Sequence, residues 1–192
     1  MADLSPDDLL PERFRDWFAT RGWAPRQHQL ELLKKTSEGH SCLLIAPTGA
    51  GKTLAGFLPS LVDLTSVHRR PIAGTSQGIR TLYISPLKAL AVDIERNLAK
   101  PVSEMGLKIS IETRTGDTPS ERKARQRVRP PHILLTTPES LSLLLSHEDS
   151  LLMFAGLKRV IIDEIHAFAN SKRGDLLSLS LARLQKLSPQ MQ

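Results

Sequence analysis

The sequence has few of the features that several protein classes require. Its single cysteine, Cys42, excludes an internal disulfide bond, favours a reducing compartment and is expected in the core. The densest leucine cluster, residues 141–145, is too short to span a bilayer. The N-terminus, MADLSPDDLL, is acidic and carries no secretory signal pattern. We therefore expect a cytoplasmic protein that acts without a membrane.

Aromatic residues make up only 4% of the chain, which argues against a platform on which nucleic-acid bases stack. By contrast, 40% of the 192 residues are hydrophobic, which is enough for one domain with its own core. Lys and Arg outnumber Asp and Glu by 26 to 20, a formal charge of +6 that favours a polyanionic partner held by its phosphates.

A phosphate-binding loop is predicted at residues 41–54, SCLLIAPTGAGKTL, where an apolar strand runs into a glycine-containing turn and a helix that begins at Lys52. Gly49 and Gly51 permit a tight turn whose N–H groups face inward, and the helix start adds unpaired amides. Lys52 would reach the β and γ phosphates, and Thr53 would ligate Mg²⁺. Ala46 stands where the strict pattern has glycine.

The remaining chain alternates strands and helices. This pattern predicts an α/β fold with a mainly parallel sheet covered by helices on both faces. Strands are expected at 41–45, 81–85, 108–113, 132–136 and 159–163. Helices are expected at 6–20, 52–67, 87–100 and 174–187; in addition, a short helix ends at 35, a basic helix ends near 129 and another helix begins at 137–139. A polar connection is expected at 69–78.

Two adjacent carboxylates, Asp163 and Glu164, end the last apolar strand. In parallel sheets functional groups gather at the carboxyl ends of the strands, so this pair is expected at the same edge as the phosphate loop. Asp163 can hold the Mg²⁺ shell, and Glu164 can orient or deprotonate the attacking water. With the loop upstream, the pair favours hydrolysis over simple nucleotide binding.

Three further strand ends are predicted to face the same edge: Ser85-Pro86, Thr115–Pro119 and Thr137-Pro138. Helix starts hold phosphates without reading bases, which suits a nucleic-acid strand gripped by its backbone, and Lys88 and Arg114 would add charge there. The densest basic run, residues 122–129, fits either a solvated helix face or a backbone contact.

Four segments resemble motifs I, Ia, Ib and II of superfamily 2 helicases: APTGAGKT, SPLKAL, TTPES and DEIH. More narrowly, ISPLKALAVD, ETRTGDTP, LLTTPESL and DEIHAFANSKRGDLL resemble the large helicase-related (Lhr) group, especially the ligase-associated DEXH-box helicases. The resemblance implies the first RecA-like lobe of a P-loop NTPase, with N-terminal helices and a Q-motif region at 1–40 and the ATP-binding lobe at 41–192. It also implies an ATP-dependent 3′-to-5′ DNA helicase or translocase in DNA repair, with ligase or nuclease partners.

The family assigns roles to the matching positions. Gln29 would read adenine, although Arg26 replaces a threonine common in that motif, and His166 would couple the ATP site to the nucleic-acid track. The resemblance implies that ATP is contacted by Gln29, Thr48, Gly49, Ala50, Gly51, Lys52 and Thr53. It implies that Thr53 and Asp163 ligate Mg²⁺, and that the catalytic residues are Lys52, Asp163, Glu164 and His166. The implied track for single-stranded DNA consists of Ser85, Pro86, Leu87, Lys88, Arg114, Thr115, Gly116, Asp117, Thr137, Pro138 and Glu139.

The sequence ends near Leu187 without motif III and without a second RecA-like lobe. In the family's fold the motif III strand lies between the phosphate-loop strand and the Asp163 strand, and the second lobe supplies arginines to the ATP cleft. We therefore expect an incomplete first lobe, marginally stable and catalytically weak alone. Two alternatives stay open: an RNA helicase lobe, and a nucleotide-binding module that does not hydrolyse.

Overall fold

The computed structural model describes residues 5–47, 49–66 and 78–192. The described residues form two compact units. The first contains the described residues up to 66 together with 100–108 and Gln192, and the second contains 78–99 and 109–191. The expected division at residue 40 stays a prediction.

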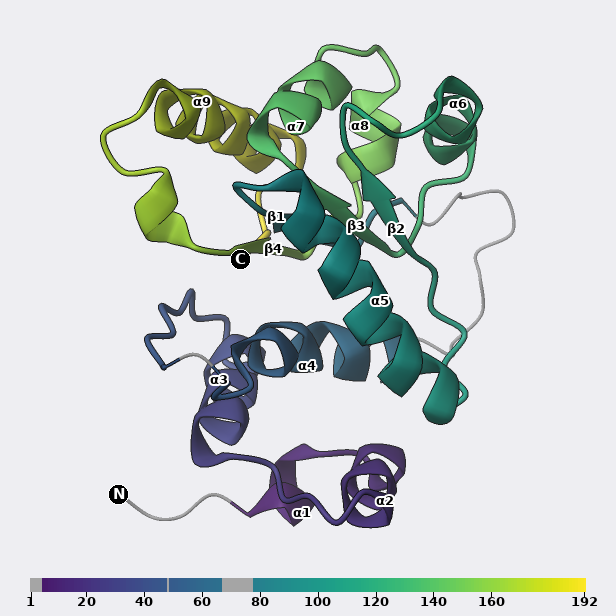
Figure 1. Cartoon of the computed structure of the whole chain (residues 1–192), viewed down its shortest axis with the longest axis vertical. Helices are drawn as coiled ribbons and strands as arrows, with labels where there is room; N and C mark the ends of the chain where they lie inside the picture. Colours follow the sequence, from purple (N-terminus) through teal and green to yellow (C-terminus); the bar gives the residue numbers. More distant parts are fainter. Residues whose placement is uncertain (1–4, 48, 67–77) are drawn as a thin grey trace. The chain divides into compact units, whose positions relative to one another are not determined.

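The first unit is helical. It contains α1 (Pro6–Leu9), α2 (Glu12–Thr20), α3 (Gln27–Ser37) and α4 (Lys52–Ser66) (Figure 1). Helices α3 and α4 pack closely, and Leu30 and Phe57 are among their buried side chains. The single helix expected at 6–20 is wrong, because Pro11 has extended backbone dihedrals and interrupts it.

The strand expected at 41–45 is also wrong. Residues 41–47 form no strand, Leu43 is 70% exposed, Ile45 is 86% exposed, and Cys42 is exposed rather than part of the core. A strand exists only where a neighbour supplies hydrogen-bonding partners. None of the strand pairs in the described part of the chain includes these residues.

The second unit is built on a parallel sheet in the order β2-β3-β1-β4. Its strands are β1 (Thr81–Ile84), β2 (Ile111–Arg114), β3 (Ile133–Thr136) and β4 (Arg159–Ile162). Thus four of the expected strands are present, and the α/β class with a parallel sheet is confirmed. Strand β2 begins at Ile111, three residues after the start of the strand predicted at 108–113.

Helices lie on both faces of this sheet. Helices α7 (Pro138–Leu145), α8 (Ser150–Phe154) and α9 (Lys172–Leu187) gather on one side (Figure 1). Their apolar side chains form one buried cluster with Leu82, Ile84 and Leu134. Thr113, which points to the opposite face, donates to the carbonyl of Ala91 in α5 (Lys88–Glu104), whose last residues belong to the first unit.

The remaining elements are α6 (Ser120–Val128), which carries the basic run, and a 3₁₀ turn, η1 (Ile165–Ala167), which follows the two carboxylates. Ser171 caps α9: its Oγ atom accepts from the Gly174 amide at 3.1 Å and donates to the Phe168 carbonyl at 2.9 Å. None of the helices in the described part of the chain is both long and apolar enough to cross a membrane.

Candidate nucleotide and nucleic-acid site

The phosphate loop has the backbone that its glycines predict. Gly49 and Gly51 have φ angles of 80° and 77°, in the left-handed region that favours glycine, and α4 begins at Lys52. The Lys52 Nζ atom bridges the loop by donating to the Ala46 carbonyl at 3.0 Å. The first amides of α4 have no intrahelical acceptor, so the loop and helix fit a polyphosphate. Thr48, an expected contact, lies outside the described residues.

Gln29 is joined directly to this loop. Its side chain is buried, its Oε1 atom accepts from the Arg26 amide at 2.9 Å, and its Nε2 atom donates to the Gly51 carbonyl at 3.4 Å. A β-carbon at Gly51 would lie 3.0 Å from that Nε2 atom, so glycine permits the close approach. The structure therefore brings together two sequence-predicted nucleotide contacts that are 22 residues apart.

The two predicted catalytic carboxylates lie at the end of β4. The Asp163 amide donates to the Ile84 carbonyl at 2.9 Å, which extends the pairing of β4 with β1. Asp163 Oδ1 accepts from the Glu164 amide at 2.9 Å, and Oδ2 accepts from the Tyr83 hydroxyl at 2.6 Å. Among the residues that the structure describes, each carboxylate oxygen accepts one hydrogen bond and retains acceptor capacity, so Asp163 fits a Mg²⁺ ligand.

Glu164 has a left-handed backbone, with φ 48° and ψ 47°, which is uncommon for a residue other than glycine. Such strain concentrates at functional sites, where the surroundings hold it. Its Oε2 atom lies 3.4 Å from Nδ1 of His166, whose side chain is 78% exposed. Glu164 and His166 therefore lie together on the turn that follows β4, and their catalytic roles stay predictions.

Tyr83 is a residue that the sequence analysis missed. Burial raises the pKa of its phenol above the ordinary value, and the hydrogen bond to Asp163 raises this pKa further, while the nearby Ser85 side chain opposes the shift. The phenol therefore stays protonated and acts as a donor. A signal was present: this is the only tyrosine of the chain, it lies in an apolar strand, and a buried tyrosine hydroxyl usually needs a partner.

The three predicted nucleic-acid segments meet at one edge of the sheet. They follow β1, β2 and β3, which are neighbouring parallel strands. The Ser85 amide donates to the Thr136 carbonyl at 3.0 Å, and the Thr136 hydroxyl donates to the Arg114 carbonyl at 2.7 Å. The side chains divide into two groups: Ser85, Pro86, Thr115, Thr137 and Pro138 are buried, and Leu87, Lys88, Gly116, Asp117 and Glu139 are exposed.

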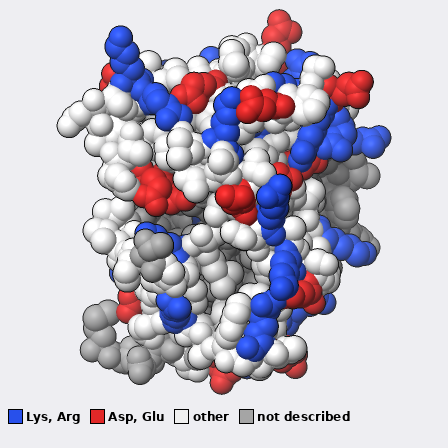
Figure 2. Space-filling view, in the orientation of Figure 1, with Lys and Arg blue, Asp and Glu red and all other residues white. Residues whose placement is uncertain are grey.

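Two ion pairs involve the exposed members: one joins Lys88 to Asp117, and the other joins Glu139 to Arg173 of α9. Lys88 Nζ lies 2.7 Å from Asp117 Oδ1, and Arg173 Nε lies 2.6 Å from Glu139 Oε1. The Arg173 guanidinium also lies 5.9 Å from the centre of the Phe168 ring. The Arg173 hydrogen bond is the main cause that lowers the pKa of Glu139 below its ordinary value. Figure 2 shows basic and acidic side chains interspersed on the face it displays.

Arg114 does not supply the surface charge expected from its position, and this expectation is wrong. Only 6% of Arg114 is exposed, and its guanidinium donates to the Lys123 carbonyl at 2.7 Å. Burial and the nearby Arg127 lower its pKa. In this conformation Arg114 therefore anchors α6 to β2.

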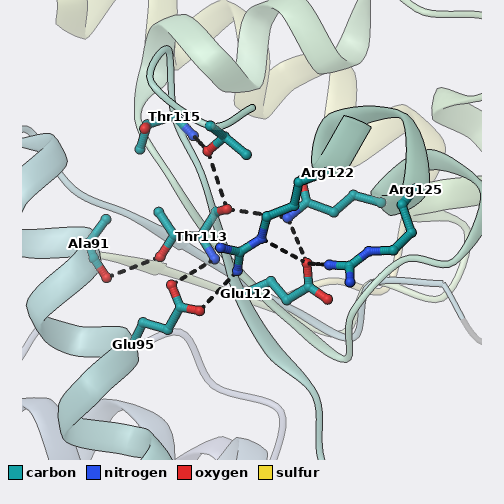
Figure 3. A network of polar contacts seen from close by, with 9 residues as sticks. Ala91, Glu95, Glu112, Thr113, Thr115, Arg122 and Arg125 are labelled. Carbon is teal, nitrogen blue, oxygen red and sulfur yellow. Dashed lines mark hydrogen bonds and ion pairs between the residues drawn. The ribbon is translucent and has the colours of Figure 1, made fainter. Parts of the chain in front are cut away.

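The basic run of α6 is largely engaged in contacts within the second unit (Figure 3). Arg122 bonds both Glu95, at 3.0 Å, and Glu112, at 3.4 Å, and Arg125 lies 2.6 Å from Glu112. The buried Gln126 side chain also donates to Glu112, at 2.8 Å. The helix therefore uses its charges to dock on β2 and α5, rather than presenting all of them to solvent.

No cluster of three or more His, Cys, Asp or Glu side chains that could hold a metal ion is found among the described residues. A magnesium ion held mainly by nucleotide phosphates needs only one or two protein ligands, and Thr53 and Asp163 are of a chemical type that suits it. They belong to different units.

The sequence profile of the DEAD/DEAH box helicase family matches residues 26–192. The "Lhr helicase/ probable uracil glycosylase" of Mycolicibacterium smegmatis is 44% identical over 183 residues, which cover 90% of this chain and 12% of that protein. The "ATP-dependent helicase Lhr-Core" of Methanocaldococcus jannaschii is 39% identical over 191 residues, covering 94% of this chain and 22% of that protein.

A solved structure of the Mycobacterium smegmatis helicase Lhr bound to ssDNA and AMP-PNP superimposes with a TM-score of 0.84, at 40% identity, over 96% of this chain and 24% of that one. The chain thus spans only about an eighth to about a quarter of the length of these relatives. Because the family profile covers the phosphate loop, the three strand-end segments and the Asp163-Glu164 pair, the chain belongs to the DEAD/DEAH box helicase family.

Proposed function

We propose that this chain is the ATP-binding lobe of an ATP-dependent helicase or translocase that moves 3′ to 5′ on single-stranded DNA during DNA repair in the cytoplasm. The observation that carries the proposal is that one sheet edge of the second unit holds two kinds of feature. Asp163 and Glu164 form one end of this edge, and the three predicted backbone-binding segments form the rest of it. An edge of this kind can couple the state of the bound nucleotide to the affinity for nucleic acid.

The residues of the chain have separable tasks in this proposal. Gln29 recognises adenine, and Lys52 and the loop amides hold the phosphates. Glu164 orients and deprotonates the attacking water, and Asp163 and Thr53 hold Mg²⁺, which neutralises charge on the phosphates when it is bound. His166, whose exposed side chain lies on the same turn, couples the ATP site to the nucleic-acid track.

The track is proposed to hold the sugar–phosphate backbone. Support comes from the exposed Lys88 and from the N-terminus of α7, which begins at Pro138. A second RecA-like lobe would complete the ATP cleft and the track, and repair ligases or nucleases would be the partners. The relatives' names support ATP-dependent helicase activity, and the ssDNA in the Lhr structure supports the choice of DNA.

The deciding experiment is ATP hydrolysis by the 192-residue chain with Mg²⁺, measured with no nucleic acid, with single-stranded DNA and with RNA of the same sequence. The Glu164→Gln variant is the control for catalysis. We expect ATP binding with very slow turnover that DNA raises more than RNA and that the variant abolishes. Equal stimulation of hydrolysis by DNA and by RNA would reject the DNA assignment, and absence of ATP binding would reject the whole proposal.

A further inference from the structure

A buried hydrogen bond joins the predicted magnesium ligand to the strand that leads into a predicted nucleic-acid segment. The Tyr83 hydroxyl donates to Asp163 Oδ2 at 2.6 Å. Ser85 follows Tyr83 by two residues, directly after the end of β1, and its Oγ atom lies 3.1 Å from the Leu87 carbonyl oxygen and 3.3 Å from the Leu87 amide nitrogen. The connection therefore runs from Asp163 through the Tyr83 side chain and the end of β1 to the start of the exposed Leu87-Lys88 segment.

The surroundings hold this connection in place. Tyr83 is 2% exposed, and Ser85, directly after the end of β1, is fully buried. Strand β1 pairs with β4 in a parallel register that aligns Tyr83 with Ile161, and the Asp163 amide extends the pairing by donating to the Ile84 carbonyl. Hydrogen bonds inside a protein are stronger than bonds exposed to water, and an unmade one costs more. A shift of the Ser85 backbone is thus resisted at Asp163.

Tyr83 supports Asp163 in the way that residues around a metal site support the side chains that ligate the metal. Groups that hydrogen-bond a ligating carboxylate fix its orientation, and their loss commonly weakens metal binding by about 10- to 100-fold. Tyr83 donates to one oxygen while the Glu164 amide donates to the other, so the carboxylate cannot rotate freely. Tyr83 also belongs to the strand that carries Ser85 to Lys88, and no second element is needed to connect them.

We propose that Tyr83 is a positioning residue that couples the nucleic-acid segment Ser85–Lys88 to the Asp163 carboxylate. Binding of a backbone phosphate at Ser85–Lys88 shifts Ser85, and Tyr83 passes this shift to the Asp163 oxygen that it holds. The reciprocal effect follows, because a coupling free energy between two sites acts equally in both directions. This inference rests on the proposed function, since it requires that both ligands bind.

The test measures binding rather than turnover, with the 192-residue chain, a fluorescent single-stranded DNA oligonucleotide and a non-hydrolysable ATP analogue with Mg²⁺. The DNA dissociation constant is measured with and without the analogue, and their ratio is the coupling factor. The Mg²⁺ concentration that gives half-maximal analogue binding is the second readout. Tyr83→Phe removes only the hydroxyl that bonds Asp163, and Ser85→Ala removes the hydroxyl that bonds Leu87.

The matched control is Thr81→Val, which removes another buried hydroxyl from the same strand and the same sheet face. Urea unfolding of each variant shows that the fold persists. We expect the control to behave as the wild type. In Tyr83→Phe the coupling factor should fall to about 1 from a wild-type value of about 5 or more. The Mg²⁺ requirement should rise about 10-fold, while DNA affinity without nucleotide stays unchanged.

The outcomes separate this inference from the function on which it rests. A wild-type chain that binds neither ligand would reject the proposed function, and the inference with it. A wild-type chain that binds both ligands without coupling would overturn the inference alone. The inference would also be overturned if Tyr83→Phe kept the wild-type coupling factor and Mg²⁺ requirement, or if Thr81→Val lost them to the same extent.

Discussion

The Arg125 Nη2 atom lies 2.6 Å from the Glu112 Oε2 atom, so a residue of the basic helix is paired with the strand beneath it. The same carboxylate accepts from Arg122 and from the buried Gln126. Only 18% of the Glu112 side chain is exposed. Glu112 is therefore the common acceptor that docks α6.

Replacing Glu112 with Ala should destabilise the chain by about 1–3 kcal/mol, because it leaves two guanidinium groups and a buried amide without this acceptor. The measurement is the free energy of unfolding in urea. Glu121→Ala, at an exposed position of α6, is the control for the loss of one carboxylate and should be close to neutral. An equal loss in both variants would mean that the network contributes nothing specific.

Replacing Arg125 and Arg127 together should leave the salt dependence of DNA binding unchanged. Arg125 is paired within the second unit, and Arg127 lies 3.5 Å from the His147 Nδ1 atom. A phosphate contact would instead contribute about 0.7 to the slope of log affinity against log salt for single-stranded DNA. The measurement is a DNA titration at several salt concentrations. A shallower slope in the double variant would show that α6 contacts the backbone.

Gly174→Ala should destabilise the chain by about 1–3 kcal/mol, because the new methyl group has no room. A β-carbon at this position would lie 2.1 Å from the Phe168 carbonyl oxygen, which is backbone and cannot move aside alone. Thermal and urea unfolding measure the loss. Ser178→Ala, at an exposed position of α9, should be neutral; an equally stable Gly174→Ala variant would show that the turn after β4 has a different packing.

The stabilisation by the Glu139–Arg173 pair should disappear in acid. Because the folded pKa of Glu139 lies below its ordinary value of 4.5, the pair stabilises the fold above that pH and loses this effect as pH falls through the folded pKa. Arg173→Ala should therefore cost up to about 1 kcal/mol near neutral pH, a small value because both side chains are half-exposed. The difference from wild type should vanish in strong acid.

The measurement for this pair is urea unfolding of wild type and Arg173→Ala from neutral pH to strong acid. Lys172→Ala, at the exposed neighbouring position, controls for the loss of one positive charge from the start of α9. A stability difference that is the same at neutral and acid pH would show that Arg173 acts through Phe168 rather than through the carboxylate.

Gln29→Glu should weaken the preference for ATP over GTP. The change replaces the Nε2 donor with an oxygen that faces the Gly51 carbonyl, and one hydrogen bond is worth about 0.5–1.5 kcal/mol, or roughly 2- to 10-fold in affinity. Equilibrium binding of both nucleotides provides the readout. Gln27→Glu, an exposed glutamine of the same helix, should keep the wild-type preference. Unaltered selectivity in Gln29→Glu would reject adenine recognition by Gln29.

The sequence by itself determined the features that depend on local order. The glycines of the phosphate loop, the start of α4 at Lys52 and the parallel β1, β3 and β4 strands follow from residue type and spacing, and each lies where the pattern predicted it. The order of strands and helices also determined that the three predicted track segments share one sheet edge, because carboxyl ends of parallel strands lie together.

Only the tertiary structure decided which side chains meet. Apolar periodicity predicted a strand at 41–45, but a strand also needs a neighbour, and Ile45 is 86% exposed. A basic pattern cannot show whether Arg114 and Arg125 face solvent or an acceptor, because Lys123 and Glu112 approach them only after β2 and α6 pack. Likewise Tyr83 and Asp163 are 80 residues apart, and the register of β1 with β4 brings the phenol to the carboxylate.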